Sequence, residues 1–225
     1  MEPNVANAVL LARDVWKSYD GRTDVLRGAS LEVAAGECAL VWGENGSGKT
    51  TLLSLLGGLD APDRGRISIG NVELSGLKER ALSRVRLLDI GFVFQTHHLI
   101  EDLTVEENLA LPLRLAKRPS DARVAELLEA FGLTKLAGRT PAQISVGESQ
   151  RVAVARSLAN GPKVLLADEP TASLDSPGTA AVLEAFRVAR TGFGAATVIA
   201  AHDSEVRSAA TREYLLDQGV LRPRA

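Results

Sequence analysis

The sequence lacks paired cysteines, a membrane-spanning run and a large net charge. Cys38 is the single cysteine among 225 residues, so no internal disulfide can form. No run of about 18 apolar residues is present to span a bilayer, and the N-terminus lacks the basic and then apolar stretches of a signal peptide. The 26 basic and 28 acidic residues give a net charge of −2, which excludes a general attraction to nucleic acid or anionic lipid. We therefore expect a cytosolic chain with no nucleic-acid partner.

The composition and the apolar segments predict an α/β fold. Hydrophobic residues make up 45% of the chain and charged residues 24%, which is ordinary for a globular core. Several apolar runs are continuous, as in strands that are buried on both faces. The expected strands are Ala8 to Val15, Ser30 to Val33, Cys38 to Trp42, Arg66 to Ile69, Gly91 to Phe94, Val164 to Ala167, Thr197 to Ala201 and Tyr214 to Leu216.

Helix-start signals follow in the second half of the chain. Thr104 and Glu107 form a capping-box pair, a helix capped by Ser120 is expected to end at residue 132, and another is expected over 176–192. The stretch from about 104 to 160 is mainly helical, and strand–helix alternation returns after it. Arg222 to Ala225 are expected to be frayed.

This order predicts one domain over residues 1–225. Its core would comprise about 1–95 and 161–225, and its helical insert about 96–160.

Residues 43–50 read Gly-Glu-Asn-Gly-Ser-Gly-Lys-Thr and follow an expected strand. They fit the phosphate-loop pattern, in which glycines let backbone N–H groups curl around phosphate oxygens and the next helix adds its positive N-terminal end. Lys49 would reach the β and γ phosphates, and the Thr50 hydroxyl would hold Mg²⁺. A Gly/Ser-rich turn can also be only a turn. The expected ATP-binding residues here are Gly43, Asn45, Gly46, Ser47, Gly48, Lys49, Thr50 and Thr51.

Two carboxylates, Asp168 and Glu169, follow the apolar strand Val164 to Ala167. Ligands of parallel sheets sit at the carboxyl ends of the strands. Asp168 fits the role of holding Mg²⁺, and Glu169 fits that of a base that polarises the attacking water. Acidic pairs are also common on protein surfaces, so this pair indicates a nucleotide site only in combination with the phosphate loop.

Six short motifs occur in order along the chain. They are the phosphate loop, Phe94-Gln95, the segment 144–151 (Ile-Ser-Val-Gly-Glu-Ser-Gln-Arg), Asp168-Glu169-Pro170-Thr171, Ser173-Leu174-Asp175 and Ala201-His202-Asp203. This series resembles the nucleotide-binding subunit of ABC transporters over almost the full length. The resemblance implies a P-loop NTPase (RecA-like) core with an antiparallel β subdomain and an inserted α-helical subdomain. It also implies an ATP-hydrolysing motor with ATP and Mg²⁺ as cofactors.

The resemblance gives roles to further residues. Tyr19 matches an aromatic residue that stacks on adenine, although a lone Tyr near a turn is more often a packing residue. Gln95 matches the glutamine that reaches Mg²⁺ and the attacking water. His202 matches the histidine that contacts the γ-phosphate and aligns Glu169, where an isolated histidine would more often be structural. The implied catalytic residues are Glu169, His202 and Gln95, the implied metal ligands are Thr50, Gln95 and Asp168, and Asp175 belongs to the D-loop.

Residues 145–148 resemble the family signature, which binds the γ-phosphate of ATP held by the opposite subunit. The implied residues are Ser145, Val146, Gly147 and Glu148. Each active site would be shared with a second copy or with a homologous subunit, so a monomer would hydrolyse ATP poorly. The family usually has glycine in place of Val146. A positive φ or close phosphate contact there would make Val costly, whereas a negative φ would make it only a tighter fit. Glu148 in place of Gln is a smaller change.

Residues 96–112 indicate the branch of the family. Their His-His-Leu and Glu-Asn-Leu-Ala-Leu-Pro runs look like the branch of lipoprotein-release, macrolide-export and cell-division ATPases. His97 and His98 could suggest a metal site, but no further His or Cys cluster supports one. The resemblance implies that this region receives a separate integral membrane subunit, and it places the chain peripherally on the cytoplasmic face of the cell membrane.

Two other functions stay open at this stage. Val146 motivates a low-turnover, ATP-sensing regulatory subunit, against which Lys49, Asp168, Glu169 and His202 argue. A soluble non-transport ABC protein would normally carry a second cassette, a coiled coil or a zinc-binding insert, and the sequence shows none of these.

Overall fold

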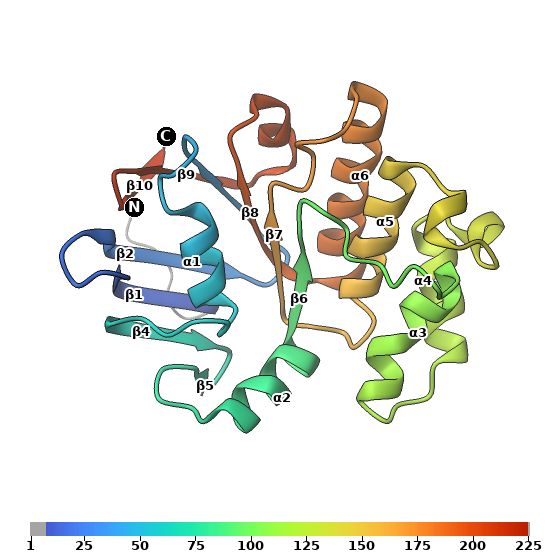
Figure 1. Ribbon diagram of the computed structural model, residues 1–225, viewed down its shortest axis with the longest axis horizontal. Coiled ribbons are helices and arrows are strands. Elements are labelled where there is room, and N and C mark those ends of the chain that lie inside the picture. Colours follow the sequence, from blue (N-terminus) through green and yellow to red (C-terminus); the bar gives the residue numbers. More distant parts are fainter. Residues whose placement is uncertain (1–7, 225) are drawn as a thin grey trace.

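The computed structural model describes residues 8–224, which form two sheets and the helices around them (Figure 1). The first sheet is antiparallel and has the strand order β2-β1-β4-β5. Its strands are β1 (Ala8–Ser18), β2 (Asp24–Ala34), β4 (Arg64–Ile69) and β5 (Val72–Glu73).

The second sheet is mostly parallel and has the order β10-β9-β3-β8-β7-β6. Its strands are β3 (Cys38–Trp42), β6 (Ile90–Val93), β7 (Val164–Asp168), β8 (Ala196–Ala201), β9 (Arg212–Asp217) and β10 (Val220–Arg224). Only the edge pair β9–β10 is antiparallel. The ends of β3, β7 and β8 therefore meet at one edge of the sheet.

Six α-helices and three 3₁₀ helices are described. They are α1 (Lys49–Leu56), α2 (Glu79–Asp89), α3 (Val105–Leu115), α4 (Asp121–Ala130), α5 (Val146–Ser157), α6 (Ser176–Phe193), η2 (Thr134–Leu136), η3 (Pro141–Gln143) and η4 (Ser204–Ala209). In Figure 1, α1 lies between the two sheets, and α3 to α6 lie on the other side of the parallel sheet. Between β6 and β7 the chain forms only helices, turns and loops.

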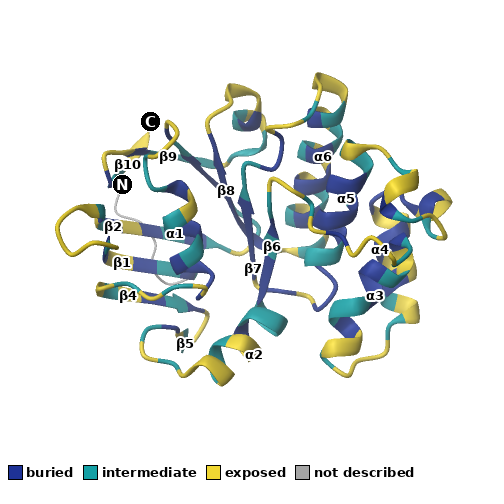
Figure 2. Ribbon diagram, viewed as in Figure 1, coloured by how far each residue is buried: buried dark blue, intermediate teal, exposed yellow. Residues whose placement is uncertain are grey.

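The parallel sheet separates two apolar cores, which explains its continuous apolar runs. Along β3, Leu40 points into the core with α3, α5 and α6, whereas Ala39 and Val41 point into the core with α1 and the antiparallel sheet. Alternate side chains of a strand point to opposite faces, so both faces of β3 must be apolar. Figure 2 shows this buried centre in dark blue. Cys38 is buried here, and burial raises the pKa of its thiol to about 12.

All eight predicted strands are present, although Phe94 lies one residue beyond β6, and α6 begins at Ser176 as expected. The capping box at Thr104 and Glu107 is present. Ser120 precedes α4, but its hydroxyl bonds to the Asp121 carboxylate instead of capping the helix, so that prediction was wrong.

The expected fraying was wrong for residues 222–224, since they pair with β9 as part of β10. Pro223 is tolerated because β10 is an edge strand. Residue 225 lies outside the described residues. Within residues 8–224 no helix is both long enough and apolar enough to cross a membrane.

Candidate functional site

Three neighbouring strand ends bring three of the six predicted motifs together. Trp42 pairs with Ala201 across β3 and β8, and Asp168 pairs with Ala200 across β7 and β8. The phosphate loop continues β3, Glu169 continues β7 and His202 continues β8. Motifs far apart in the sequence therefore share one edge of the sheet, as Figure 1 shows.

The phosphate loop needs its glycines for shape. Gly46 and Gly48 have φ of 81° and 104°, which L side chains rarely adopt, and Gly48 directly precedes α1. A Cβ on Gly43 would come within 2.5 Å of the Leu216 carbonyl oxygen and 2.6 Å of the Ser47 hydroxyl. The loop is thus held tightly at the positive N-terminal end of α1.

Lys49 is buried at the centre of the site, with 6% exposure. Its ammonium donates to the carbonyl oxygens of Gly43 at 2.7 Å and of Glu44 at 3.1 Å. The same nitrogen lies 3.2 Å from Glu169 Oε1. Glu169 Oε1 has no hydrogen-bond partner among the described residues, so this contact is a charge–charge contact without hydrogen-bond geometry.

The side chains of Thr50 and Asp168 are joined by a hydrogen bond. The Thr50 hydroxyl donates to Asp168 Oδ2 at 2.7 Å, whereas Asp168 Oδ1 is buried without a hydrogen-bond partner in the described structure. Burial raises the pKa of Asp168; the Thr50 hydrogen bond and the Lys49 charge oppose this, and the Glu169 charge adds to it. A hydroxyl and a carboxylate with a free buried oxygen fit Mg²⁺, which prefers oxygen ligands.

Glu169 and His202 form the second half of the cluster. His202 Nδ1 lies 2.9 Å from Glu169 Oε2, and the two side chains are 49% and 15% exposed. Glu169 has a φ of 47°, which is strained for a residue other than glycine, and its N–H donates to the Ala200 carbonyl at 2.9 Å. The strand neighbour thus helps to hold the strained backbone that directs the carboxylate between Lys49 and His202.

Two predicted residues are not brought into this cluster. Gln95 lies two residues beyond β6 and is exposed, and no hydrogen bond among the described residues joins it to Thr50 or Asp168. Tyr19 directly follows β1 and is 63% exposed, with the Lys17 ammonium 5.1 Å from its ring centroid. Asn45 is exposed in the phosphate loop, and Thr51 is half-buried on α1.

Ser145 is the N-cap of α5 and forms a capping box with Glu148. The Ser145 hydroxyl accepts from the Glu148 N–H at 3.2 Å, and Glu148 Oε2 accepts from the Ser145 N–H at 2.8 Å. The hydrogen bond from the Ser145 backbone is the main cause that lowers the pKa of Glu148. The Ser-x-x-Glu spacing signals this box, so the sequence could have shown the role of Glu148.

Val146 is the first residue of α5 and is 55% exposed. It is not among the residues with positive φ, so the strained alternative raised by the sequence does not apply here. Residues 145–148 share a groove of about 490 Å³ with Ser173, Leu174 and Asp175, and no residue of the phosphate loop lines it. Asp175 caps α6 by accepting from the Gly178 N–H at 2.9 Å.

The sequence did not indicate two side chains of α5 that hold the segment after β6. Gln150 Nε2 donates to the Phe94 carbonyl at 2.8 Å, and Arg156 donates to the carbonyls of His97 at 2.9 Å and His98 at 2.7 Å. The His98 ring is engaged locally, since its Nε2 lies 2.7 Å from the Thr96 hydroxyl. Helix α5, which begins with the signature residues, is thereby hydrogen-bonded to the segment that carries Gln95.

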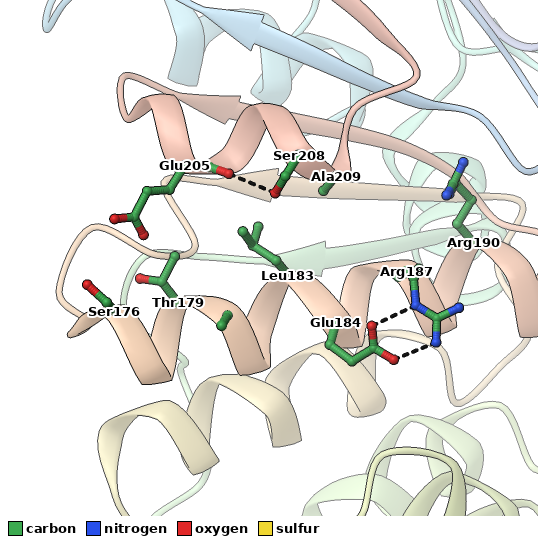
Figure 3. A pocket seen from close by; sticks show the side chains of 10 residues that line it. Ser176, Thr179, Leu183, Glu184, Arg187, Arg190, Glu205, Ser208 and Ala209 are labelled. Atoms are coloured by element: carbon green, nitrogen blue, oxygen red, sulfur yellow. Dashed lines mark hydrogen bonds and ion pairs between the residues drawn. The ribbon is translucent and has the colours of Figure 1, made fainter.

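A groove of about 480 Å³ lies elsewhere, between α6 and η4 (Figure 3). Glu184 and Arg187 bond to each other on the α6 side of it. None of the predicted nucleotide-site residues lines this groove.

A phosphate loop at one strand end and paired carboxylates at a neighbouring strand end define a P-loop nucleotide-binding protein. The family model described as "ABC transporter" matches residues 26–172. The chain belongs to the ABC transporter family, as its ATP-binding subunit that hydrolyses ATP.

Three relatives illustrate the match. The lipoprotein-releasing system ATP-binding protein LolD 2 of Caulobacter vibrioides is 44% identical over 210 residues, 92% of each chain. The ATP-binding cassette MJ0796, solved as a dimer in a post-hydrolysis state bound to ADP and Pi, is 34% identical, with a TM-score of 0.84 over 96% of this chain and 97% of that one. The protein cbiO1 from Clostridium perfringens, part of the ABC transporter complex cbiONQ, is 28% identical, with a TM-score of 0.88 over 96% of this chain and 87% of that one.

Proposed function

We propose that this chain is the motor ATPase of a lipoprotein-release type ABC transporter and that it drives a separate membrane subunit from the cytoplasmic face of the membrane. The observation that carries the catalytic part is the chain of contacts from Lys49 through Glu169 to His202. The similarity to LolD supports the type of transporter. ATPase rates measured with and without a co-purified membrane subunit test the proposal, and absence of both basal and stimulated hydrolysis would contradict it.

Each residue of the cluster has a task in this proposal. Lys49 binds the β and γ phosphates, and the backbone N–H groups of the phosphate loop surround them. Thr50, Asp168 and Gln95 would hold Mg²⁺, which neutralises phosphate charge when bound. Glu169 accepts the proton of the attacking water, and His202 orients Glu169 and contacts the γ-phosphate. Tyr19 offers an exposed ring for the adenine.

The groove lined by residues 145–148 would complete the ATP site of a second subunit. Because the groove that residues 145–148 line includes no residue of the phosphate loop of their own chain, we assign them to the γ-phosphate held by a partner copy. The cassette MJ0796 was solved as a dimer bound to ADP and Pi. We assign this contact to the Ser145 hydroxyl, the backbone N–H groups at Val146 and Gly147, and the N-terminal end of α5.

The membrane subunit would dock where the core meets the helical insert, about 96–160. A groove of about 250 Å³ is lined there by Leu87 of α2, by Leu111, Pro112 and Leu115 of α3 and by Arg156 of α5. Leu115 is exposed at this groove. Arg156 also holds the His97 and His98 carbonyls, so movement in the groove would reach the segment of Gln95.

Substitutions at the exposed segment after Gln95 should uncouple the ATPase from its membrane partner. Asn108 fixes the Ile100 backbone through hydrogen bonds of 2.9 and 3.1 Å, while the Ile100 side chain points to solvent. Ile100→Trp and Glu101→Lys should therefore change the surface without moving the loop. We expect loss of partner stimulation with unchanged ATP affinity. Glu184→Lys on α6 is the charge-reversal control, and full stimulation of both segment variants would rule out docking here.

Val146→Gly tests the low-turnover alternative. A strained φ costs about 1–3 kcal/mol, and 1.4 kcal/mol is a factor of ten in rate. Because Val146 is unstrained and exposed, glycine removes no strain and adds only unfolded-state entropy. We expect ATPase rates within about threefold of wild type, measured with the membrane partner. A rise of about tenfold or more would instead mean that Val146 crowds the partner's γ-phosphate.

A further inference from the structure

Trp42 connects the phosphate loop to the histidine segment. It is the last residue of β3 and directly precedes Gly43, and its backbone pairs with Ala201 of β8. Its indole Nε1–H donates to the backbone carbonyl oxygen of His202 at 3.1 Å. Two residues separated by 160 positions are thus joined by a side-chain hydrogen bond next to the proposed reaction centre.

A second contact joins the same indole to the residues that follow His202. The Arg207 guanidinium carbon lies 5.9 Å from the Trp42 ring centroid, within the range of a cation–π contact. Arg207 belongs to η4, whose start is fixed by the Asp203 carboxylate accepting from the Glu205 N–H at 3.0 Å. Arg224 of β10 lies 5.5 Å from the same centroid. The half-buried Trp42 ring therefore holds the segment 202–207 at both of its ends.

We propose that Trp42 is a positioning residue for catalysis, which fixes the peptide of His202 so that its imidazole stays directed at Glu169. The His202 side chain is half exposed, and Glu169 Oε2 at 2.9 Å is its hydrogen-bond partner among the described residues. Its direction therefore depends on its backbone, and the indole N–H holds that backbone from the side of the phosphate loop. Any shift of the loop at Gly43 is passed to His202 through the same side chain.

This inference rests on the proposed role of His202, so the experiment must separate the two. ATP hydrolysis by the full chain is measured at protein concentrations that support the ATP-dependent dimer. Trp42→Phe keeps an aromatic ring and removes the donor. A second variant carries 3-benzothienyl-alanine at position 42, which keeps the indole shape and has sulfur in place of N–H.

Trp16→Phe is the matched control. Trp16 Nε1 donates to Asp14 Oδ1 at 2.9 Å, so this variant also loses one indole hydrogen bond, but in the antiparallel sheet. We expect both Trp42 variants to lower kcat about three- to tenfold, the scale of one lost hydrogen bond, with KM for ATP unchanged within about twofold. The control should leave both constants unchanged. Urea unfolding should show similar stability for the benzothienyl variant and the wild type.

A double-mutant cycle with His202→Ala identifies the path of the effect. If Trp42 acts through His202, Trp42→Phe should not lower kcat further once His202 is alanine. Additive losses, or a raised KM with unchanged kcat, would overturn the inference. If His202→Ala hydrolyses ATP slowly but both Trp42 variants are fully active, the inference about Trp42 is wrong and the proposed role of His202 stands. Full activity of His202→Ala would contradict the proposed site itself, and the inference with it.

Discussion

Glu169→Gln should keep ATP binding and slow hydrolysis by about 10²-fold or more, the usual scale for loss of a positioned general base. The substitution is nearly isosteric, and a glutamine can still form a hydrogen bond with His202 Nδ1, which lies 2.9 Å from the present carboxylate. What it removes is the charge that faces Lys49 at 3.2 Å and the capacity to accept a proton. ATP affinity should therefore be retained while the rate of hydrolysis falls.

Nucleotide titration and single-turnover hydrolysis measure these two effects. Because ATP is consumed slowly, an ATP-dependent dimer should also accumulate and be visible by light scattering with Mg-ATP. Glu205→Gln is the control, since it removes a carboxylate from the exposed start of η4, three residues after His202. A variant that stays monomeric well above any plausible affinity would count against the shared site, and near-normal turnover would count against Glu169 as the base.

The strands of this fold were predictable because both faces of the parallel sheet are buried. A short, continuous apolar run such as Val164 to Ala167 is typical of a strand with no solvent-facing side. Helix α2 was not predicted from the sequence, in which its few apolar residues lie among the charged residues Glu79, Arg80, Arg84 and Arg86, and of its side chains only Val85 is buried. Strand β10 was missed because the Arg-Pro-Arg run at 222–224 reads as a tail, whereas its pairing with β9 depends on a strand that can be placed only in three dimensions.

For the candidate site, too, some features were predictable from the sequence and others were not. The phosphate-loop pattern and the carboxylates at a strand end predicted Lys49, Asp168 and Glu169, because both have fixed local patterns. His202 was predicted only through the resemblance to the ABC family. Backbone angles could not be read from residue type: Glu169 takes a positive φ, whereas Val146, where glycine is usual, does not. Contacts across the sheet were also hidden. The Trp42–His202 bond requires β3 to lie beside β8, and sequence order gives no such neighbour.

Lys49→Ala should lower ATP affinity by about 10²-fold or more, since hydrogen bonds to charged groups contribute roughly 1.5–3 kcal/mol each and 1.4 kcal/mol is tenfold in affinity. The structure adds a second consequence. Lys49 bonds to the Gly43 and Glu44 carbonyls and faces Glu169, so alanine also removes the cross-link of the phosphate loop and leaves a largely buried carboxylate without its counter-charge. Removing one partner of a buried pair is typically costly. We therefore expect a lower unfolding free energy as well.

Lys163→Ala is the control, because it shows the effect of removing an ion-paired lysine outside the phosphate loop. Lys163 lies 2.9 Å from Asp89, and its side chain is half exposed, so its removal should cost less than about 1 kcal/mol and leave ATP affinity unchanged. Calorimetric titration gives the affinity, and urea unfolding without nucleotide gives the stability. Loss of stability alone, with wild-type affinity in the fraction that remains folded, would mean that Lys49 supports the loop without binding phosphate. Loss of affinity in a well-folded variant is the outcome that the position of this ammonium, between the loop carbonyls and the carboxylate of Glu169, leads us to expect.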